Sequence, residues 1–214
     1  MPKIQGVKIR SIVLAPGRES ATIEMVNQTT KTITAFAYAY DITLIDGQHR
    51  KGVHMAERIG GMIGRENRLQ LAPAAVGPLE PGEVHNEIFH FGEPEKVAGL
   101  AVTMEVLIYI DLTSESINQW VLDNFIAQRA SEAEVASSVA DAIAAAMQDE
   151  HPHQSAHDRL LKMKHSETDL RNLESGTFAN VDEERKHLAW LLTYHRSYAA
   201  TLAKHAKIAG GSHE

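Results

Sequence analysis

Histidines are the residues of this chain whose type and spacing could do chemistry. The sequence holds twelve histidines in 214 residues, and eight of them follow residue 150. The tightest group is His151, His153 and His157, of which the last two are four residues apart. On a helix this spacing places two imidazoles on one face, which is the arrangement of many zinc sites.

Carboxylates beside these histidines could complete a metal site. Asp149, Glu150 and Asp158 are the nearest ones in the sequence. The pattern lacks the His-Glu-x-x-His motif of zinc peptidases, and Pro152 stands between the first two histidines at the start of a predicted helix. The alternative interpretation is an exposed, polar helix start, which we favour. We therefore expect no metal and no cofactor, and keep His151, His153 and His157 as the candidate metal ligands.

Other residue patterns indicate packing rather than catalysis. His195 falls within an apolar stripe that also carries Tyr194 and Leu191, so we expect a packed histidine rather than a general base. Trp190, Tyr194 and Tyr198 recur every four residues, as helix-packing residues do. No catalytic or cofactor-binding residue is assigned. The chain has no cysteine, no Gly-x-Ser-x-Gly elbow and no Walker motif around the glycines of 60–64.

Composition narrows the class of partner. The formal net charge is −7, and Lys and Arg are scattered along the chain. A surface that follows phosphates needs clustered cations, so we expect no nucleic-acid partner. No stretch approaches the roughly 20 consecutive apolar residues of a membrane-spanning helix, so we expect no transmembrane segment.

The elements that must position these residues change type along the chain. Eleven of 14 Gly and six of seven Pro lie before residue 100, whereas the later half is rich in Ala, Leu, Glu and His. Gly and Pro mark turns, and Ala favours helix. The first half is therefore predicted to be β-structure and the second half helical.

Alternation of apolar and polar residues predicts six or seven strands in the first half. The segment from Gln48 to Arg68 has no clear period and is predicted to be a mobile loop or an irregular edge hairpin. The expected strands lie at 9–14, 21–27, 32–45, 69–71, 84–91 and 100–110.

Helical spacing begins at Ser116, and about three helices are predicted. The first carries Ile117, Trp120, Val121 and Phe125 on its apolar face, and the capping-box pattern at 131–134 predicts that it breaks and restarts there. The second begins at Pro152, and the third begins after Asn180. The apolar face of the second helix is expected to hold Leu160, Leu161, Leu170 and Leu173.

Three runs in the first half carry a resemblance to a known family. ATIEMVNQTTKTITAFAYAYDITLIDG, LEPGEVHNEIF and AVTMEVLIYID resemble the immunoglobulin-like sandwich of uncharacterised, often exported bacterial proteins, over roughly residues 9–130. Such proteins usually end the last strand in Asp-Gly-Thr, where this chain has Asp111-Leu112-Thr113. The resemblance implies a fold and no catalytic residues.

These observations combine into an α+β prediction. We expect an N-terminal immunoglobulin-like antiparallel β-sandwich at 1–113 and an α-helical extension or bundle at 116–214. The expected function is that of a non-enzymatic binding or structural module whose helical segment mediates self-association or association with a protein partner. The alternative is a metal-binding or hydrolytic protein that uses the histidine-rich C-terminal half. The protein is expected outside the cytoplasm if Met1 begins a trimmed exported chain, and in the cytoplasm otherwise.

Overall fold

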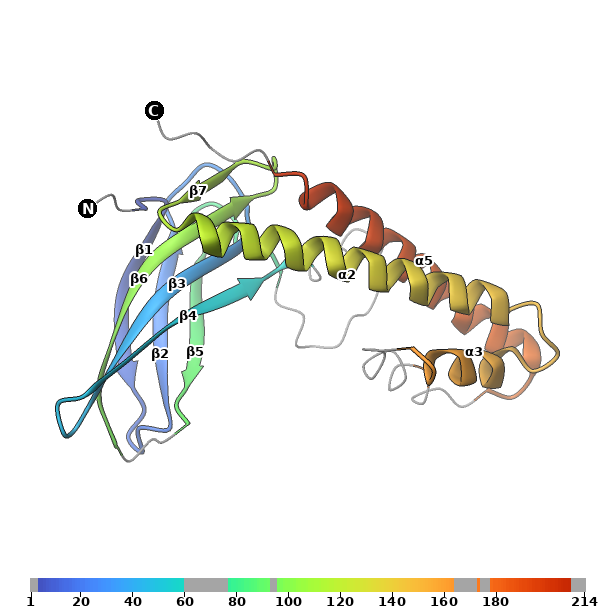
Figure 1. The fold of residues 1–214 in the computed structure, drawn as a ribbon, viewed down its shortest axis with the longest axis horizontal. Coiled ribbons are helices and arrows are strands. Elements are labelled where there is room, and N and C mark those ends of the chain that lie inside the picture. The colour runs from blue at the N-terminus through green and yellow to red at the C-terminus, as the bar shows by residue number, and fades with distance from the viewer. Residues whose placement is uncertain (1–3, 60–76, 93–95, 164–172, 174–177, 209–214) are drawn as a thin grey trace. The chain divides into compact units, whose positions relative to one another are not determined.

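The computed structural model describes residues 4–59, 77–92, 96–163, 173 and 178–208. In this part of the chain seven strands come first and three helices follow, which confirms the α+β prediction (Figure 1). The strands are β1 (Val7–Leu14), β2 (Ser20–Asn27), β3 (Ile33–Leu44), β4 (His49–Glu57), β5 (Val84–His90), β6 (Val97–Tyr109) and β7 (Ser114–Ser116). The helices are α2 (Gln119–Ala146), α3 (Pro152–Leu160) and α5 (Val181–His205).

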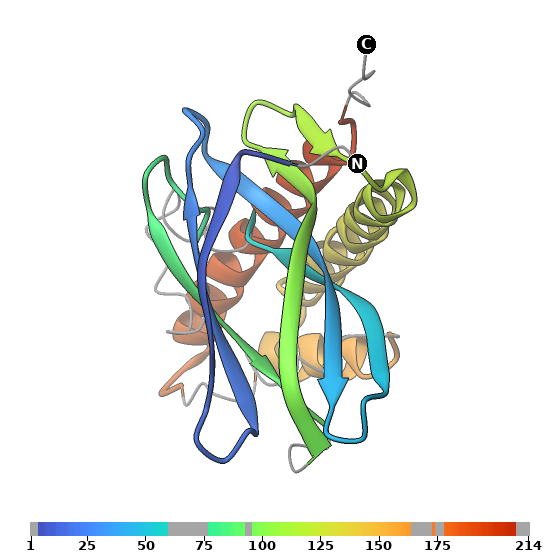
Figure 2. The ribbon, with the colours of Figure 1, turned by 90° about the vertical axis from the view of Figure 1, so that its left-hand side faces the viewer.

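The strands form two antiparallel sheets, with the orders β1-β2-β5 and β4-β3-β6-β7. The long strands β3 and β6 run side by side in the second sheet (Figure 2). This is the strand order of an immunoglobulin-type sandwich with one difference, because the fourth strand pairs with the third rather than with the fifth. The predicted antiparallel sandwich is therefore present, and β4 and β5 are edges of different sheets.

Apolar side chains of both sheets meet in one core. Ile23 and Met25 from the first sheet pack with Phe36, Tyr38 and Leu107 from the second, and all five are fully buried. Residues of β3 that alternate along the strand therefore point into the sandwich, as the sequence pattern predicts. This alternation fixes which side chains of the neighbouring edge strand β4 also point inward.

Of the two structures predicted for Gln48 to Arg68, a mobile loop or an irregular edge hairpin, the loop is wrong for the first part of the segment, because His49–Glu57 is a regular strand at the edge of its sheet. It pairs with β3 without a register shift. Gly52 lies opposite Tyr40, and a Cβ at Gly52 would lie 2.4 Å from the Tyr40 hydroxyl oxygen. The glycine that suggested a loop thus makes room for an aromatic ring on the adjacent strand. The remainder of that segment and the strand predicted at 69–71 lie outside the described residues.

The described chain forms two compact units, and the division falls inside α2 after Phe125. The sandwich unit holds the described residues up to Phe125 together with 207–208. The helical unit holds the described residues of 126–206.

The helices of the helical unit differ from the sequence prediction at two places. α2 runs through 131–134 without a break, so the predicted restart is wrong. The Ala-rich sequence on both sides favours an uninterrupted helix over a new cap. Leu161 is 58% exposed and follows the end of α3, so it is not on the predicted apolar face, whereas Leu160 and Leu173 are buried.

The other helix predictions for this unit are confirmed. α3 begins at Pro152, and α5 begins after Asn180, whose side chain accepts a hydrogen bond from the Glu183 backbone N–H at 3.0 Å. Side chains of α2, α3 and α5 share one apolar cluster, which includes Val139, Ile143, Leu160, Leu188 and Leu191. No helix in the described ranges is long and apolar enough to cross a membrane.

Candidate functional site

Four ionisable side chains meet between the two sheets at their edges. His54 and Arg58 come from β4 and the residue after its end, and His85 and Glu87 come from β5. We call these four residues the inter-sheet cluster. His85 and Glu87 alternate with the exposed residues of β5, and Val84, Asn86 and Ile88 face outward. The strand period thus turns both charged side chains toward the interior.

The four side chains form a connected set of polar contacts. Glu87 lies 2.8 Å from His85 Nε2 and 3.4 Å from His54 Nε2, through its two different carboxylate oxygens. Arg58 Nη2 lies 2.6 Å from His85 Nε2 and 3.6 Å from Glu87 Oε2. Arg58 Nη1 also donates to the Gly77 carbonyl oxygen at 3.0 Å. One carboxylate is therefore surrounded by a guanidinium and two imidazoles.

The contacts of His85 depend on which of its ring nitrogens carries a proton. Its Nε2 atom can accept a hydrogen bond from Arg58 or donate one to Glu87, and a single protonation state cannot do both. A neutral ring with the proton on Nδ1 favours the arginine contact. A ring protonated at Nε2 favours the carboxylate contact.

Aromatic rings enclose the cluster. The Arg58 guanidinium lies 5.0 Å from the centre of the Phe36 ring, and the His54 ring stacks on Tyr38 with centroids 4.9 Å apart. The Tyr38 hydroxyl is buried and has no hydrogen-bond partner in the described structure. Burial, together with the nearby Glu87 charge, raises the pKa of Tyr38 well above its usual range. Tyr38 is therefore neutral and acts as part of the core.

The electrostatics of the cluster favour a fixed ion over a working acid or base. Burial alone would raise the pKa of Glu87, but hydrogen bonds from His54 and His85 and their charges lower it from 4.5 to about 2. Burial lowers the pKa of Arg58, and the Glu87 charge opposes this. A general base near neutral pH needs a pKa near 7, so the Glu87 carboxylate is poorly suited to proton transfer.

The donor set of the cluster was tested for a metal ion. Two imidazole Nε2 atoms and one carboxylate are common zinc ligands, but the Arg58 guanidinium contacts His85 Nε2 and lies beside Glu87. A fixed cation at that position would repel a second one. Within the residues that the structure describes, no group of three or more His, Asp or Glu side chains is placed to hold a metal ion.

The three histidines singled out from the sequence have different surroundings. His151 is exposed at the N-cap position of α3. The His153 ring packs 4.9 Å from Phe178, and its Nε2 lies 3.0 Å from the Leu173 carbonyl oxygen, so that nitrogen carries a proton and cannot bind a metal. His157 lies 3.7 Å from the Asp158 carboxylate. In the described contacts, His151, His153 and His157 have no partner in common.

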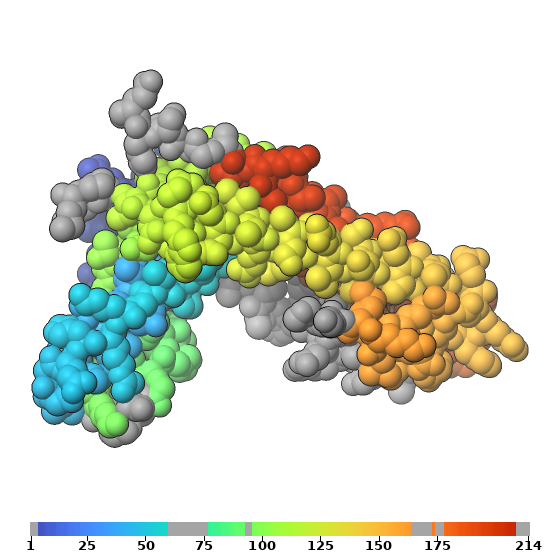
Figure 3. All heavy atoms as spheres, viewed as in Figure 1, coloured from blue at the N-terminus to red at the C-terminus, as the bar shows by residue number. Residues whose placement is uncertain are grey.

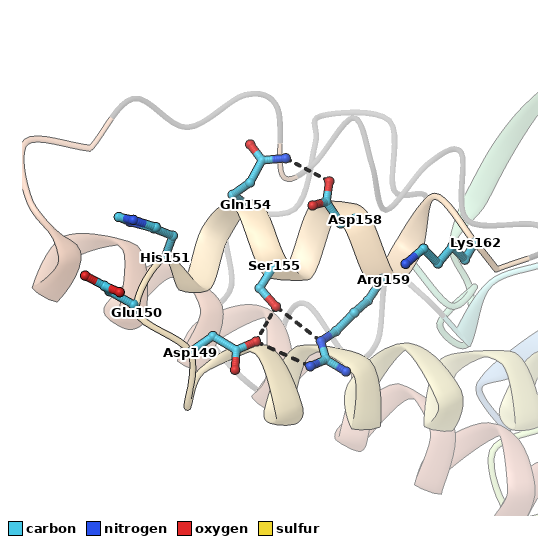
Figure 4. A pocket seen from close by; sticks show the side chains of 8 residues that line it. All are labelled: Asp149, Glu150, His151, Gln154, Ser155, Asp158, Arg159 and Lys162. Atoms are coloured by element: carbon cyan, nitrogen blue, oxygen red, sulfur yellow. Dashed lines mark hydrogen bonds and ion pairs between the residues drawn. The ribbon is translucent and has the colours of Figure 1, made fainter.

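An open pocket of the helical unit lies along α3 and the turn before it (Figure 4). Ser155 donates a short hydrogen bond to the Asp149 carboxylate, and Arg159 contacts both, at 3.2 Å and 3.3 Å. These contacts lower the pKa of Asp149, which makes it a poor base for activating the Ser155 hydroxyl. The His151 ring points away from Ser155 and toward the Glu150 side of the pocket (Figure 4). The pocket thus lacks the serine–histidine contact of a hydrolase. The eight lining residues are Asp149, Glu150, His151, Gln154, Ser155, Asp158, Arg159 and Lys162.

Two histidines of α5 are buried instead of exposed. His195 and His205 are 4% and 2% exposed, which confirms that His195 is a packed residue. Burial lowers the pKa of His195 to about 4, and burial together with the charges of Arg129 and Lys204 lowers the pKa of His205 to about 4. Both imidazoles are therefore neutral at physiological pH.

A row of aromatic rings follows one side of α5. Successive rings of His187, Trp190, Tyr194 and Tyr198 lie 6.0, 6.4 and 5.8 Å apart, with interplanar angles of 11° to 14°. Leu188 and Leu191 on the same helix are buried, whereas 37% of Trp190 is exposed. We call His187, Trp190, Tyr194 and Tyr198 the aromatic row. It lies at the border between the core of the helical unit and its surface.

The sequence reasoning missed the inter-sheet cluster. The sequence held one signal for this cluster. The inward positions of β5 should be apolar, as Phe89 is, but His85 and Glu87 occupy two of them. The partner residues His54 and Arg58 fell in the segment interpreted as a loop. Recognising the site required knowing that β4 and β5 face each other.

Comparisons with known proteins give one structural similarity. No protein-family model matches the sequence, and no curated protein matches it significantly. A solved structure of a hypothetical protein from Peptoclostridium difficile 630 matches part of the chain. That match has a TM-score of 0.35 and 12% sequence identity, and it covers 56% of this chain and 90% of the other chain.

Proposed function

We propose that the protein is a non-enzymatic binding module that associates through its helical unit, with the immunoglobulin-like sandwich as a scaffold. The observation that carries this proposal is the aromatic row on α5. Aromatic residues are enriched at protein interfaces because a large rigid ring loses little conformational entropy when it is buried. Trp190 offers such a ring while it is still partly exposed.

The ionisable groups support the same proposal. The Glu87 carboxylate is neutralised by His54, His85 and Arg58, so it stabilises the sandwich rather than reacting with a substrate. Asp149 beside Ser155 has a lowered pKa. Neither group has the raised pKa that acid catalysis uses at neutral pH.

Removal of Trp190 tests the proposal, and Trp120 gives a matched control. Both tryptophans lie on helices and are exposed, but Trp120 belongs to the sandwich unit and is 69% exposed. Of the residues predicted on the apolar face of this helix, Val121 and Phe125 are buried, whereas Trp120 is exposed. We expect Trp190→Ala to weaken self-association in sedimentation velocity, whereas Trp120→Ala leaves it unchanged.

Two results would contradict self-association through the aromatic row. One is a protein that remains a strict monomer from low micromolar to near-millimolar concentration. The other is an equal effect of both tryptophan substitutions, because a general loss of apolar surface would then explain the change. Far-UV circular dichroism of each variant checks that the helices remain intact.

A further inference from the structure

After its acidic first turn, which holds Asp182, Glu183 and Glu184, α5 carries outward charges of one sign. Arg185, Lys186, Arg196 and Lys204 are exposed, and the sequence from Arg185 to His205 contains no Asp or Glu. No ion pair joins any of these four cations to another residue in the described part of the chain. In a chain of net charge −7, the part of α5 from Arg185 onward therefore presents a positive surface.

The outward charges of α2 in the same unit have the opposite sign. Glu134 and Asp141 are exposed, and they share one face because they are seven residues apart. The only base of α2 is Arg129, which is 1% exposed and donates to the His205 carbonyl oxygen at 3.3 Å. Arg129 therefore does not contribute positive charge to the surface of α2.

The two helices lie side by side in antiparallel directions. Arg129 near the middle of α2 contacts His205 at the end of α5, Glu132 accepts a hydrogen bond from Tyr198 at 3.2 Å, and Ile143 packs in the cluster that holds Leu188. The surface of α2 is in front in Figure 3, in yellow-green to yellow. The helical unit thus carries an acidic helix surface and a basic helix surface next to each other.

We propose that the partner of this surface is a second copy of the same chain, with α5 of each copy on α2 of the other. This inference rests on the proposed function and names the partner. A twofold axis brings the same patch of both copies together, so adjacent acidic and basic strips become complementary when one copy is rotated onto the other. Each ionic contact is then formed twice, with Glu134 and Asp141 facing the cations of the partner's α5.

Charge sets the choice of partner in this arrangement, and the aromatic row supplies apolar contact. Exposed ion pairs contribute little affinity individually, but complementary potentials select the partner and fix its orientation. Lys186 and Trp190 are four residues apart and share one side of α5. A copy docked on this side would cover the exposed part of the Trp190 ring and contact Lys186 together.

Charge reversal on each helix separates this proposal from other modes of association. The first variant, Lys186→Glu with Arg196→Glu, reverses two of the four exposed cations of α5, so that carboxylates on α5 would face Glu134 and Asp141 of the other copy. The second, Glu134→Lys with Asp141→Lys, makes the outward surface of α2 basic, so that it would face the cations of α5. We expect each variant alone to dimerise at least about tenfold more weakly than the unmodified chain, because like charges then face each other. Mixing the two variants restores both contacts and should restore the dimer as a heterodimer.

A matched control changes the same number of charges away from the helical unit. Lys8→Glu with Lys51→Glu reverses two exposed lysines of the sandwich unit, and we expect no effect on dimerisation. The dimer of the unmodified chain should also weaken with added salt. Sedimentation velocity measures the homodimers, and mass photometry or native mass spectrometry distinguishes the heterodimer by mass.

The outcomes separate the two proposals. A strictly monomeric unmodified chain overturns the α2–α5 pairing, and the proposed function then requires a different protein as partner. Association that Trp190→Ala weakens but charge reversal leaves unchanged supports the binding function and overturns the α2–α5 pairing. Folded variants that fail to form a heterodimer also overturn the pairing. Binding of a single-stranded oligodeoxythymidylate that is lost with Lys186→Glu and Arg196→Glu, without any dimer, would assign the basic surface to nucleic acid and overturn the pairing.

Discussion

Mild acid should destabilise the helical unit through its two buried histidines. His195 and His205 each have a pKa lowered by burial from 6.5 to about 4. The folded state therefore binds fewer protons than the unfolded state when the pH lies between these two values. The stability that depends on neutral imidazoles is fully present above about pH 6.5 and is lost progressively as the pH falls toward about 4.

The size of the effect follows from the two pKa values. At about pH 5, an unfolded histidine is almost fully protonated and a folded one with a pKa of about 4 is mostly neutral, which corresponds to about 2 kcal/mol per residue. Together, His195 and His205 should remove about 4 kcal/mol relative to neutral pH. Natural domains have about 5–15 kcal/mol of stability, so this loss brings the unit close to unfolding.

Denaturant unfolding, followed by helical circular dichroism at about pH 7 and about pH 5, measures this loss. A double variant with His195→Gln and His205→Gln has no imidazole to protonate at these positions, so its stability should change much less between the two pH values. The exposed His151→Gln substitution is the matched control and should retain the full pH dependence. An unchanged pH dependence in the double variant would refute the reasoning, because other groups would then carry it.

Two further predictions concern the sandwich unit. Glu87→Gln should cost about 3 kcal/mol at neutral pH, because a pKa lowered from 4.5 to about 2 adds that much stability, and acid removes this stability as the pH falls from 4.5 to about 2. The control is Glu24→Gln, at a half-buried position with a long ion pair to Arg10, and it should cost less than about 1 kcal/mol. Equal melting temperatures for these two variants would contradict the account of the inter-sheet cluster. Gly52→Ala should cost about 1–3 kcal/mol because its Cβ would overlap the Tyr40 ring, whereas Gly99→Ala, with open space around it, should be tolerated. A calorimetric comparison of these two alanine variants checks the contact, and equal stability would show that Tyr40 moves aside without cost.

The sequence predicts the fold well wherever one face of an element is apolar. β3 and β6 have long alternating runs, and α5 has a capping residue, acidic residues in its first turn and a buried stripe. The regular strand β4 was predicted only as a mobile loop or an irregular edge hairpin, because His49, Arg50 and Lys51 are exposed and Gly52 lies in its interior. Charges at an edge prevent aggregation, but they also hide the strand period.

The candidate site was less predictable than the fold because its residues come from both sheets. His54 and Arg58 are 27 or more positions away from His85 and Glu87 in the sequence, and no local spacing connects the two pairs. His153 and His157 have the spacing of metal ligands on a helix, yet the His153 ring packs against Phe178 and its Nε2 donates a hydrogen bond to a backbone carbonyl. Spacing predicts a shared helix face, whereas partners on other elements decide what each side chain contacts.

The topology of the sandwich explains why charged residues lie between its sheets. In the immunoglobulin constant arrangement the fourth and fifth strands pair, but here β4 pairs with β3, so β4 and β5 become edges of different sheets. Inward-pointing charges are one way in which natural sheets protect such edges from pairing with other strands. Because Glu87 on β5 attracts His54 on β4 and Arg58 just beyond it, the same charges hold the two edges together across the sandwich. Replacing only one member would leave a buried charge without compensation. The four residues of the inter-sheet cluster therefore act together, and not as separate contacts, in fixing the position of β4.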